Sequence, residues 1–373
     1  PCGGDLPFHT NHGVANYFGV GGYRRPLEDA RRAEVRFASE CLAIANVPDD
    51  ATLDALGLAA TGDLYDDARW KAGVPGDQGT DWDFDDVRDH YLALLFGVDP
   101  ARLRRTDRPR YLALSRQVSG EVMAEVFGEW RRAGSPCSGG IVLWLRDLLP
   151  GAGWGLIDAT GRPKAAAHHL RRALAPVAVW MTDEGQNGID AHVANDGPEP
   201  LRARLRVALY RDGEHCIEDA AADLDLPAHG TATHGIEAII GRFVDASYAF
   251  RFGPPGHDAV VATLEDRDGV IHSQAFRFPA GRPIAPQDAA TLGMSAVARD
   301  AADGSVTLTI SSRRLAYGVR VDAPGFSPSD DAFCVEPGGS RTVRLRARTR
   351  QASLEQASLT ALNLRGSCAI RVE

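Results

Sequence analysis

The spacing of apolar residues changes near Pro176, and this change limits the possible folds more than any other feature of the chain. Beyond it, apolar and polar residues alternate with period two in residues 201–209, 306–310 and 343–347, between Asp-Gly and Pro-Gly turn signals. One buried face, one wetted face and frequent turns predict antiparallel β-sandwiches. A proline-bounded linker at 279–286 predicts two such domains, residues 176–281 and 282–373.

Before Pro176, helical patterns alternate with short apolar runs. Apolar residues recur at helical spacing in 85–96, 111–132 and 162–174, and residues 141–145 are continuously apolar. That run predicts a parallel strand buried on both faces. Residues 36–39 indicate a second strand, and the acidic segment 49–80 predicts an excursion over the surface. Helices alternating with buried strands are typical of an α/β barrel or of a doubly wound sheet. A (β/α)8 TIM barrel takes ~250 residues, so residues 1–175 could be only the C-terminal portion of one.

Charge and composition exclude several classes of function. The net charge is -9, with 41 Lys+Arg against 50 Asp+Glu, which argues against a nucleic-acid partner. No apolar run reaches the ~18 residues that a membrane helix needs, and no signal-peptide pattern is present. We expect a soluble bacterial-type protein of the cytoplasm or periplasm, with the cytoplasm favoured and no membrane partner. The start at Pro1, in loop-like sequence, predicts a piece of a longer polypeptide.

The sequence offers little for a metal ion. The 6 cysteines lie far apart without a CxxC pair, so we expect reduced thiols and no zinc site. Asp5, His9 and His12 carry ligand-type side chains, but no further His or Cys cluster follows, and hydrogen bonding within a loop is the default interpretation. Ser39 has no G-x-S-x-G context, which argues against a serine hydrolase. We expect no metal and no cofactor.

Glu40 stands at the end of the predicted strand 36–39, and Trp144 and Asp147 stand near the end of the next apolar run. A carboxylate at the end of a buried strand is costly unless it is paired or used in chemistry. Catalytic groups of a barrel lie at the C-terminal ends of strands. A carboxylate beside an aromatic side chain there suits sugar chemistry. A structural ion pair at a strand end is the alternative.

Several stretches, in one order along the chain, resemble the C-terminal half of glycoside hydrolase family 2 enzymes of the β-mannosidase branch. Residues 16–20 with 26–28 resemble the segment HYWGVW…EPFE, and 36–40 resemble RFVSE, whose Glu is the family's nucleophile. Residues 154–158 with 161–164 resemble SWSSIDYYGRPK, after the eighth barrel strand. Residues 325–326, 330–333 and 337–338 resemble GF…SDNYFDLLPGE of the last Ig-like domain.

This resemblance implies a retaining exo-β-glycosidase that acts on a β-linked sugar or oligosaccharide through a covalent glycosyl-enzyme intermediate. Glu40 matches the nucleophile. The second carboxylate, the acid/base, would lie ~5–5.5 Å away. In the family it is a Glu after Asn, upstream of the nucleophile, and no Asn-Glu pair precedes Glu40 here. The resemblance therefore implies that the acid/base belongs to a missing N-terminal half of the same polypeptide, and that this chain alone is an incomplete enzyme.

The sugar subsite departs from the family pattern. Asn16, Gly21 and Gly22 replace the His, Trp and His of HYWGVWH, so the preference for mannosides is in doubt. We assign substrate binding to Asn16, Tyr17, Trp144 and Asp147. An ungapped match places the family's Trp at Leu143, one residue before Trp144. Because a one-residue shift on a strand exchanges faces, either an insertion or deletion returns Trp144 to the site or Trp144 packs outside the barrel.

A second hypothesis comes from a different class of function. The sandwiches could serve as a non-catalytic carbohydrate-binding or structural module, with Glu40 in a structural ion pair. An exposed row of aromatic side chains on one sandwich would favour binding. The sequence shows only scattered candidates there, such as Trp180, Tyr210, Tyr248 and Tyr317.

Overall fold

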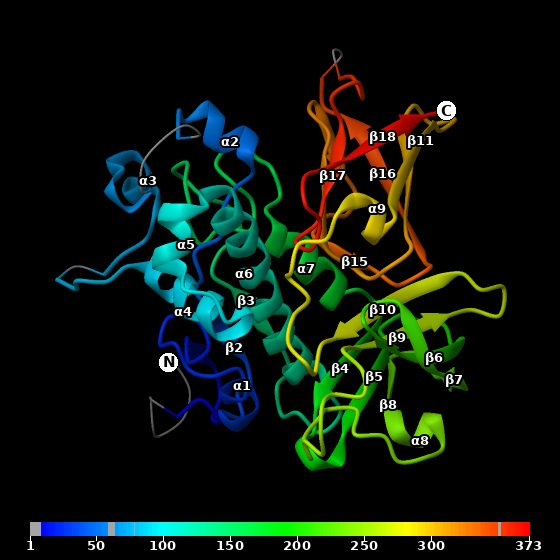
Figure 1. The fold of residues 1–373 in the computed structure, drawn as a ribbon. Coiled ribbons are helices and arrows are strands. Elements are labelled where there is room, and N and C mark those ends of the chain that lie inside the picture. Colours follow the sequence, from blue (N-terminus) through cyan, green and yellow to red (C-terminus); the bar gives the residue numbers. More distant parts are fainter. Residues whose placement is uncertain (1–8, 59–63, 78, 350–351) are drawn as a thin grey trace. The chain divides into compact units, whose positions relative to one another are not determined.

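The computed structural model describes residues 9–58, 64–77, 79–349 and 352–373 (Figure 1). The chain divides into two compact units, Pro1–Leu174 and Ala175–Glu373. The predicted ligand-type residue Asp5 and the cysteine Cys2 lie outside the described residues. No helix in the described part of the chain is both long and apolar enough to cross a membrane.

Unit 1 combines helices with three short strands. In chain order its elements are β1 (Ala15–Tyr17), α1 (Asp29–Arg32), β2 (Ala38–Cys41), α2 (Asp50–Ala55), the 3-10 helix η1 (Leu64–Asp66), α3 (Ala68–Gly73), α4 (Phe84–Phe96), α5 (Pro100–Thr106), α6 (Arg108–Arg131), β3 (Gly140–Val142) and α7 (Ala165–Ala173).

The three strands form one parallel sheet in the order β1-β2-β3. Its buried face packs on α6 through Trp130, whose ring contacts Tyr17 with centroids 5.5 Å apart. A Cβ at Gly140 would meet the Trp130 ring at 2.9 Å, so glycine permits this close packing. The sequence prediction that residues 141–145 are buried on both faces is wrong. The strand ends at Val142 and forms an edge of the sheet, and Ile141 is 57% exposed.

The two long helices of unit 1 confirm the predicted helical spacing. Helix α4 begins with a capping box in which Asp83 and Asp86 bond reciprocally to backbone N–H groups, and it ends at Gly97 in the left-handed conformation. Helix α6 begins at the cap Asp107, whose side chain accepts from the Arg110 N–H. It contacts α1, α4, α5 and α7. Helix α6 is therefore the central element of unit 1.

The prediction that 49–80 is a surface excursion is wrong for much of its described part. The segment contains α2, η1 and α3, and Trp70 on α3 is fully buried. The Trp70 indole N–H donates to Asp85 Oδ2 at 2.7 Å, and Lys71 pairs with Asp83 at 2.5 Å. These partners lie on or next to α4, a later element. The acidic composition of the segment therefore did not reveal that it packs against α4.

Unit 2 consists mainly of strands. Its elements are β4 (Val177–Asp183), the 3-10 helix η2 (Gly185–Asn187), β5 (Ile189–Asn195), β6 (Leu201–Arg211), β7 (His215–Leu226), β8 (Gly230–Gly235), α8 (Ile236–Ile240), β9 (Ala259–Glu265), β10 (Ile271–Arg277), α9 (Ala289–Leu292), β11 (Met294–Asp300), β12 (Val306–Ser312), β13 (Ala316–Asp322), β14 (Phe326–Pro328), β15 (Phe333–Val335), β16 (Ser340–Ala347), β17 (Ser358–Thr360) and β18 (Cys368–Val372).

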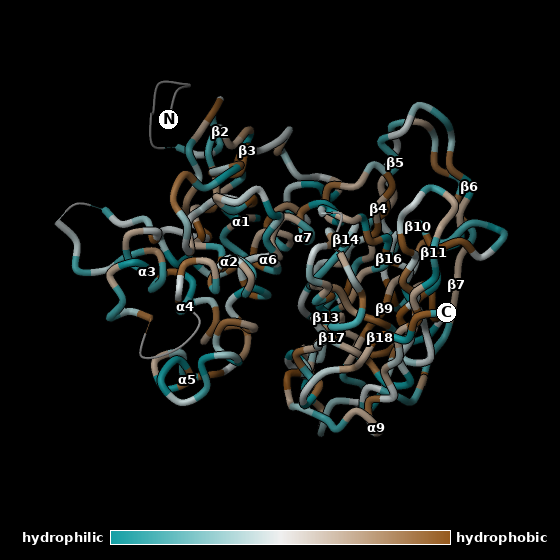
Figure 2. The backbone as a smooth tube through the Cα atoms, turned by 90° about the horizontal axis from the view of Figure 1, so that it is seen from above, coloured by the Kyte–Doolittle hydropathy of each residue, from teal (hydrophilic) through white to brown (hydrophobic). Residues whose placement is uncertain are grey.

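The strands of unit 2 enclose two apolar cores. The sheets β4-β5-β8 and β10-β9-β6-β7 contribute to one core, which includes Leu205, Val207 and Leu264. The eight-stranded sheet β14-β16-β12-β11-β18-β17-β13-β15 curls around the other, which includes Leu308, Ile310 and Leu345. Period-two burial on β12 agrees with the predicted alternation. Figure 2 shows the apolar character of inner strands such as β9.

A buried carboxylate joins the two halves of unit 2. Glu336, just after β15, accepts from the Tyr210 hydroxyl at 2.5 Å, from Arg206 at 2.7 Å and from the Gln274 amide at 2.8 Å. Leu315 packs beside Tyr210 in a small apolar cluster at the same boundary. The charged acceptor is fully used, which a buried carboxylate requires.

Five of the 6 cysteines lie within the described residues. Cys41, Cys137, Cys216, Cys334 and Cys368 form no disulfide. Cys41 is fully buried, and burial raises the pKa of its thiol to about 12.

Candidate active site

Glu40 lies on the central strand of the parallel sheet, at its C-terminal end. Its register partner on β1 is Asn16, and the next residue, Cys41, pairs with Val142 on β3. Because the strands are parallel, their carboxyl ends meet at one edge of the sheet, where α/β proteins place ligands. The sheet thus brings Glu40 together with Asn16 and with the segment that follows β3.

The Glu40 carboxylate is exposed and held by a polar neighbour. The Asn16 amide Nδ2 donates to Glu40 Oε2 at 3.3 Å, and the Ser39 hydroxyl donates to Asn16 Oδ1 at 2.7 Å. The Ser39 bond fixes which end of the Asn16 amide faces the carboxylate. No cation pairs with Glu40 within the described ranges of the chain. The carboxylate is therefore oriented by hydrogen bonds and open to solvent.

The backbone immediately after this strand is unusual. Leu42 and Ala43, both buried, adopt φ of 78° and 49°. Left-handed conformations cost non-glycine residues roughly 1–2 kcal/mol each. Such costs persist where the surroundings enforce them, and they cluster at functional sites. The Leu42 N–H donates to Tyr17 O at 3.1 Å and Leu42 O accepts from Gly22 N–H at 3.1 Å, which holds the turn in place.

Tyr17 lies on the opposite face of β1 from Asn16. Its hydroxyl donates to Asp29 Oδ2 at 2.9 Å, and burial, followed by the negative charge of Asp29, raises the pKa of Tyr17 well above its usual value. Tyr17 and Asn16 both line a cleft of about 840 Å³ that also includes Tyr23, Arg25 and Asp29. Two of the predicted substrate-binding residues therefore border one cleft, although the Tyr17 hydroxyl is committed to Asp29.

Trp144 follows β3 at the same edge of the sheet as Glu40. The Leu143 N–H donates to Cys41 O at 3.2 Å, and the peptide bond between Leu143 and Trp144 is cis. The Trp144 side chain is 42% exposed, and its ring meets the Trp154 ring edge-on with centroids 5.6 Å apart. Trp154 in turn contacts Phe84 at 4.7 Å. Trp144 is thus the exposed member of an aromatic array beside the strand ends.

Asp147 occupies a different environment from the other predicted residues. Its side chain is 5% exposed and forms an ion pair with Lys164, and its Oδ1 accepts from the Gly155 N–H at 2.7 Å. The structure therefore places this carboxylate in the interior, with its oxygens engaged by the protein itself.

The loop that contains Gly21 and Gly22 packs tightly against the turn at Leu42 and Ala43. Gly21 has φ of 106°, and a Cβ there would lie 1.6 Å from Leu42 O. The Gly21 N–H donates to the Tyr91 hydroxyl at 2.7 Å. With this backbone, position 21 cannot carry the Trp of the resembled pattern. Backbone atoms of Leu42 and the buried Tyr91 therefore pack against position 21, where the resembled pattern has an indole.

Sequence reasoning did not select Trp154 or Lys164 as site residues, although both lie in a quoted motif. The signal that could have found them is the glycine spacing of Gly151, Gly153 and Gly155. Side chains at Gly153 and Gly155 would collide with Asp147, at 2.3 and 2.5 Å. Glycines at alternate positions thus mark a loop wrapped around a buried group.

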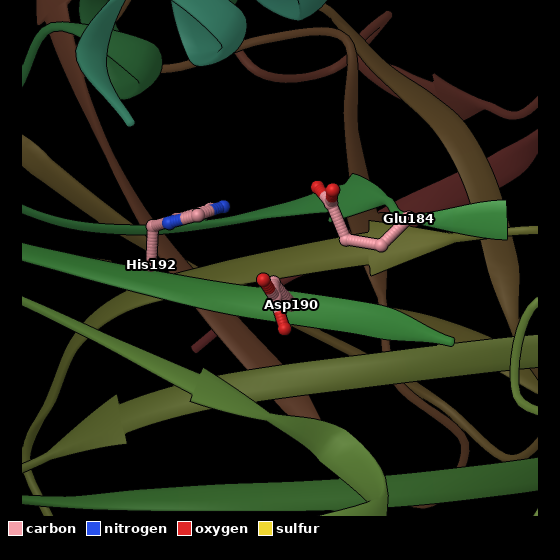
Figure 3. A group of neighbouring side chains, drawn as sticks. All are labelled: Glu184, Asp190 and His192. Atoms are coloured by element: carbon pink, nitrogen blue, oxygen red, sulfur yellow. The ribbon is translucent and has the colours of Figure 1, made fainter. Parts of the chain in front are cut away.

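Two clusters of ligand-type side chains are explained by hydrogen bonds. His12 Nδ1 bonds to Asn11 Oδ1 at 2.6 Å in the N-terminal loop. In unit 2, Glu184, Asp190 and His192 approach one another near the β4–β5 turn (Figure 3). The His192 ring nitrogens bond to Thr182 at 2.7 Å and Thr233 at 3.0 Å, and Thr182 donates to Glu184 at 2.6 Å. We assign no metal to either cluster.

Known proteins are similar to this chain in sequence and in fold. No protein-family model matches the chain. Beta-mannosidase B of Aspergillus niger is 24% identical over 259 residues, which span 64% of this chain and 29% of that protein. Beta-mannosidase B of Aspergillus flavus is 33% identical over 257 residues, with 64% and 29% covered. The chain thus spans less than a third of the length of these relatives.

Solved structures agree with the sequence matches. The β-D-mannosidase of Dictyoglomus thermophilum superposes with a TM-score of 0.77 at 17% identity, covering 97% of this chain and 42% of that one. The exo-β-D-glucosaminidase CsxA superposes with a TM-score of 0.63 at 16% identity, covering 89% and 42%. In sequence and in fold the chain is thus similar to the C-terminal region of β-mannosidases and related exo-glycosidases of the glycoside hydrolase family 2 type.

Proposed function

We propose that this chain is the C-terminal part of a retaining exo-β-glycosidase in which Glu40 is the nucleophile. The observation that carries the proposal is the position of Glu40 at the C-terminal end of the central parallel strand. There it is oriented by Asn16 at 3.3 Å and followed by the strained residues Leu42 and Ala43. The β-mannosidase relatives support β-linked sugars as the substrate class.

The chemistry follows from an exposed, oriented carboxylate. A Glu40 oxygen attacks the anomeric carbon and forms a glycosyl ester. The bond to the leaving oxygen breaks, and a second carboxylic acid ~5–5.5 Å from Glu40 protonates that oxygen. Water then hydrolyses the ester with the second group acting as base. Asn16 keeps the attacking carboxylate in position through its amide hydrogen bond.

We further propose that the parallel sheet is the end of a (β/α)8 barrel over residues 1–175, followed by sandwiches over 176–281 and 282–373. Strands β1 and β3 are the edges of the sheet, and the cleft at Asn16 lies beside β1. Beyond β3, Leu145, Leu148 and Leu149 are exposed. Open edges and apolar side chains favour pairing with further strands. An upstream segment of the same polypeptide would supply them, together with the acid/base.

Covalent trapping tests the nucleophile. In the complete gene product, a 2-deoxy-2-fluoro-β-mannosyl fluoride should lose fluoride and leave its sugar esterified to the peptide that contains Glu40, detected by mass spectrometry. Glu40→Gln should abolish the adduct and lower turnover of an aryl β-mannoside by at least about a thousandfold, the scale of removing a covalent nucleophile.

Glu34→Gln is the matched control, because Glu34 is an exposed carboxylate six residues earlier in the chain. It should label and turn over substrate as the unsubstituted protein does. Wild-type turnover by Glu40→Gln, or an adduct on another carboxylate, would remove Glu40 from the role. A parallel panel of aryl β-glucosaminides and β-glucosides tests how the Gly21 substitution alters sugar preference.

A second candidate function is carbohydrate binding by the first sandwich, with no catalysis. It is favoured by exposed Phe243 and Phe252, which flank Phe250 with ring centroids 5.6 and 5.8 Å away. Of the residues that the sequence suggested, Tyr210 and Tyr317 are buried. Under this alternative, Phe252→Ala would weaken retention on immobilised mannan, while Glu40→Gln would change neither retention nor turnover.

A further inference from the structure

A buried ion pair joins three segments of unit 1 beneath the aromatic array. The Lys164 ammonium, 1% exposed, donates to Asp147, to Asn46 O at 2.7 Å and to Gly153 O at 3.2 Å. Asn46 follows β2, Asp147 follows β3, and Lys164 immediately precedes α7. We call Asn46, Asp147 and Lys164 the hub. It connects the segment that carries Glu40 with the loop that carries Trp144.

The hub fixes the backbone on both sides of Trp154. The Asn46 N–H donates to Gly153 O at 2.8 Å, and its side-chain amide donates to Trp154 O at 3.0 Å. Asp147 Oδ1 accepts from the Gly155 N–H at 2.7 Å. Because side chains at positions 153 and 155 would strike Asp147, the loop is built around this carboxylate.

The fixed loop in turn supports the exposed indole. Trp144 O accepts from the Leu156 N–H at 3.1 Å, and Leu145 O accepts from the Ile157 N–H at 2.9 Å. The Trp154 ring, clamped through its own backbone, meets the Trp144 ring at 77°. Movement of the Trp154 backbone would therefore tilt the Trp144 ring beside the end of β2.

Stability is a poor explanation for the hub. A buried ion pair loses the hydration of two charges, and apolar replacement of such pairs is often neutral or stabilising. Burial lowers the pKa of Lys164, although the charge of Asp147 opposes that shift. Hydrogen bonds with defined directions favour a single loop conformation.

We infer that Asn46, Asp147 and Lys164 are positioning residues that hold the Trp144 ring in the orientation needed to stack on a sugar at Glu40. This inference rests on the proposed function and extends it. It also gives Asp147 a role in orienting the loop, in place of the direct substrate contact expected from the sequence. The reaction rate and the affinity for substrate both fall steeply when a supporting group of the enzyme shifts by about 1 Å.

A double-mutant cycle in the complete gene product tests the inference. Asp147→Leu/Lys164→Met replaces the ion pair with apolar side chains and should raise KM for an aryl β-mannoside on the order of 10-fold, with a smaller change in kcat. Trp144→Ala should also raise KM. If the hub acts through Trp144, the hub substitutions should add less than about twofold in the Trp144→Ala background. If the increases in KM from the hub substitutions and from Trp144→Ala instead multiply, the inference is overturned.

Thr52→Val is the matched control, because it removes a buried hydrogen bond of 2.6 Å to Asp158 near the same loop without touching the hub. It should leave KM unchanged. Near-ultraviolet circular dichroism separates the inference from the proposed function. Even if no sugar is turned over, the Trp144–Trp154 signal should be lost in Asp147→Leu/Lys164→Met and kept in Thr52→Val. An unchanged signal in the hub variant would overturn the positioning role.

Discussion

The parallel sheet of unit 1 and the mainly antiparallel sheets of unit 2 differ in how they bury their apolar strands. In unit 2, the strands surround two cores whose central members, such as Leu205 and Leu308, are fully buried. In unit 1, the sheet packs one face on α6, and apolar residues next to its edge strand, such as Leu148, remain exposed. The apolar faces of the unit 2 strands are therefore buried within unit 2 itself. The sheet of unit 1, in contrast, has unpaired edges and holds the candidate nucleophile.

Separating the units should give the largest effect. Residues 175–373, expressed alone, should fold as a monomer with a cooperative thermal transition, because the two cores are internal. Residues 1–174, expressed alone, should associate or precipitate, because the edge strands and exposed leucines are uncovered. Size-exclusion chromatography and calorimetry check both pieces. If residues 1–174 were monomeric and unfolded cooperatively, the claim that unit 1 leaves its apolar edges uncovered would be wrong.

Truncating a leucine in each unit should change the free energy of unfolding by different amounts. Leu308→Ala on β12 should lower the free energy of unfolding by about 2–5 kcal/mol, since it opens a cavity in a closed core. Leu148→Ala, at a site 86% exposed, should change it by less than about 0.5 kcal/mol. Urea unfolding of the two variants measures the difference. Equal losses would mean that Leu148 is covered in solution.

The carboxylate between the halves of unit 2 should have a smaller effect. Glu336→Leu removes the acceptor of Tyr210, Arg206 and Gln274 and should cost about 1–3 kcal/mol, because it leaves the buried Tyr210 hydroxyl without its acceptor. Glu336→Gln retains one acceptor oxygen and should cost less. A single cooperative transition that splits into two in Glu336→Leu would show that this contact couples the sandwiches. Identical stability of both variants would contradict the assignment.

The smallest effect concerns the pH dependence of Cys41. Its folded pKa of about 12 lies above the unfolded value, so between the two pKa values the folded state binds more protons. Stability should therefore fall as pH rises through that window, by at most about 1.4 kcal/mol per pH unit from this group. Cys41→Ala should flatten the slope of stability against pH in urea unfolding under mildly alkaline conditions. Cys216→Ala should flatten the slope less, because burial raises the pKa of this thiol too but the site is exposed.

Local sequence patterns determined a large part of the fold. Period-two alternation identified the regions of β6, β12 and β16, and helical spacing with stop signals identified α4 and α6. These patterns are readable because each face of a strand or helix meets one environment. The motif around Glu40 also located the candidate nucleophile, and its place at a strand end follows from a short apolar run.

The tertiary structure alone decided how distant segments meet. Cys41 pairs with Val142 on a strand far along the chain, and this register brings the segment that carries Trp144 to the same edge of the sheet as Glu40. The sequence could not show that Asp147 would be buried against Lys164, nor that Trp70 would donate to Asp85. In the sequence, a carboxylate residue at an exposed site cannot be distinguished from one in a buried ion pair. Only the packing of other segments around the carboxylate determines whether it stays hydrated.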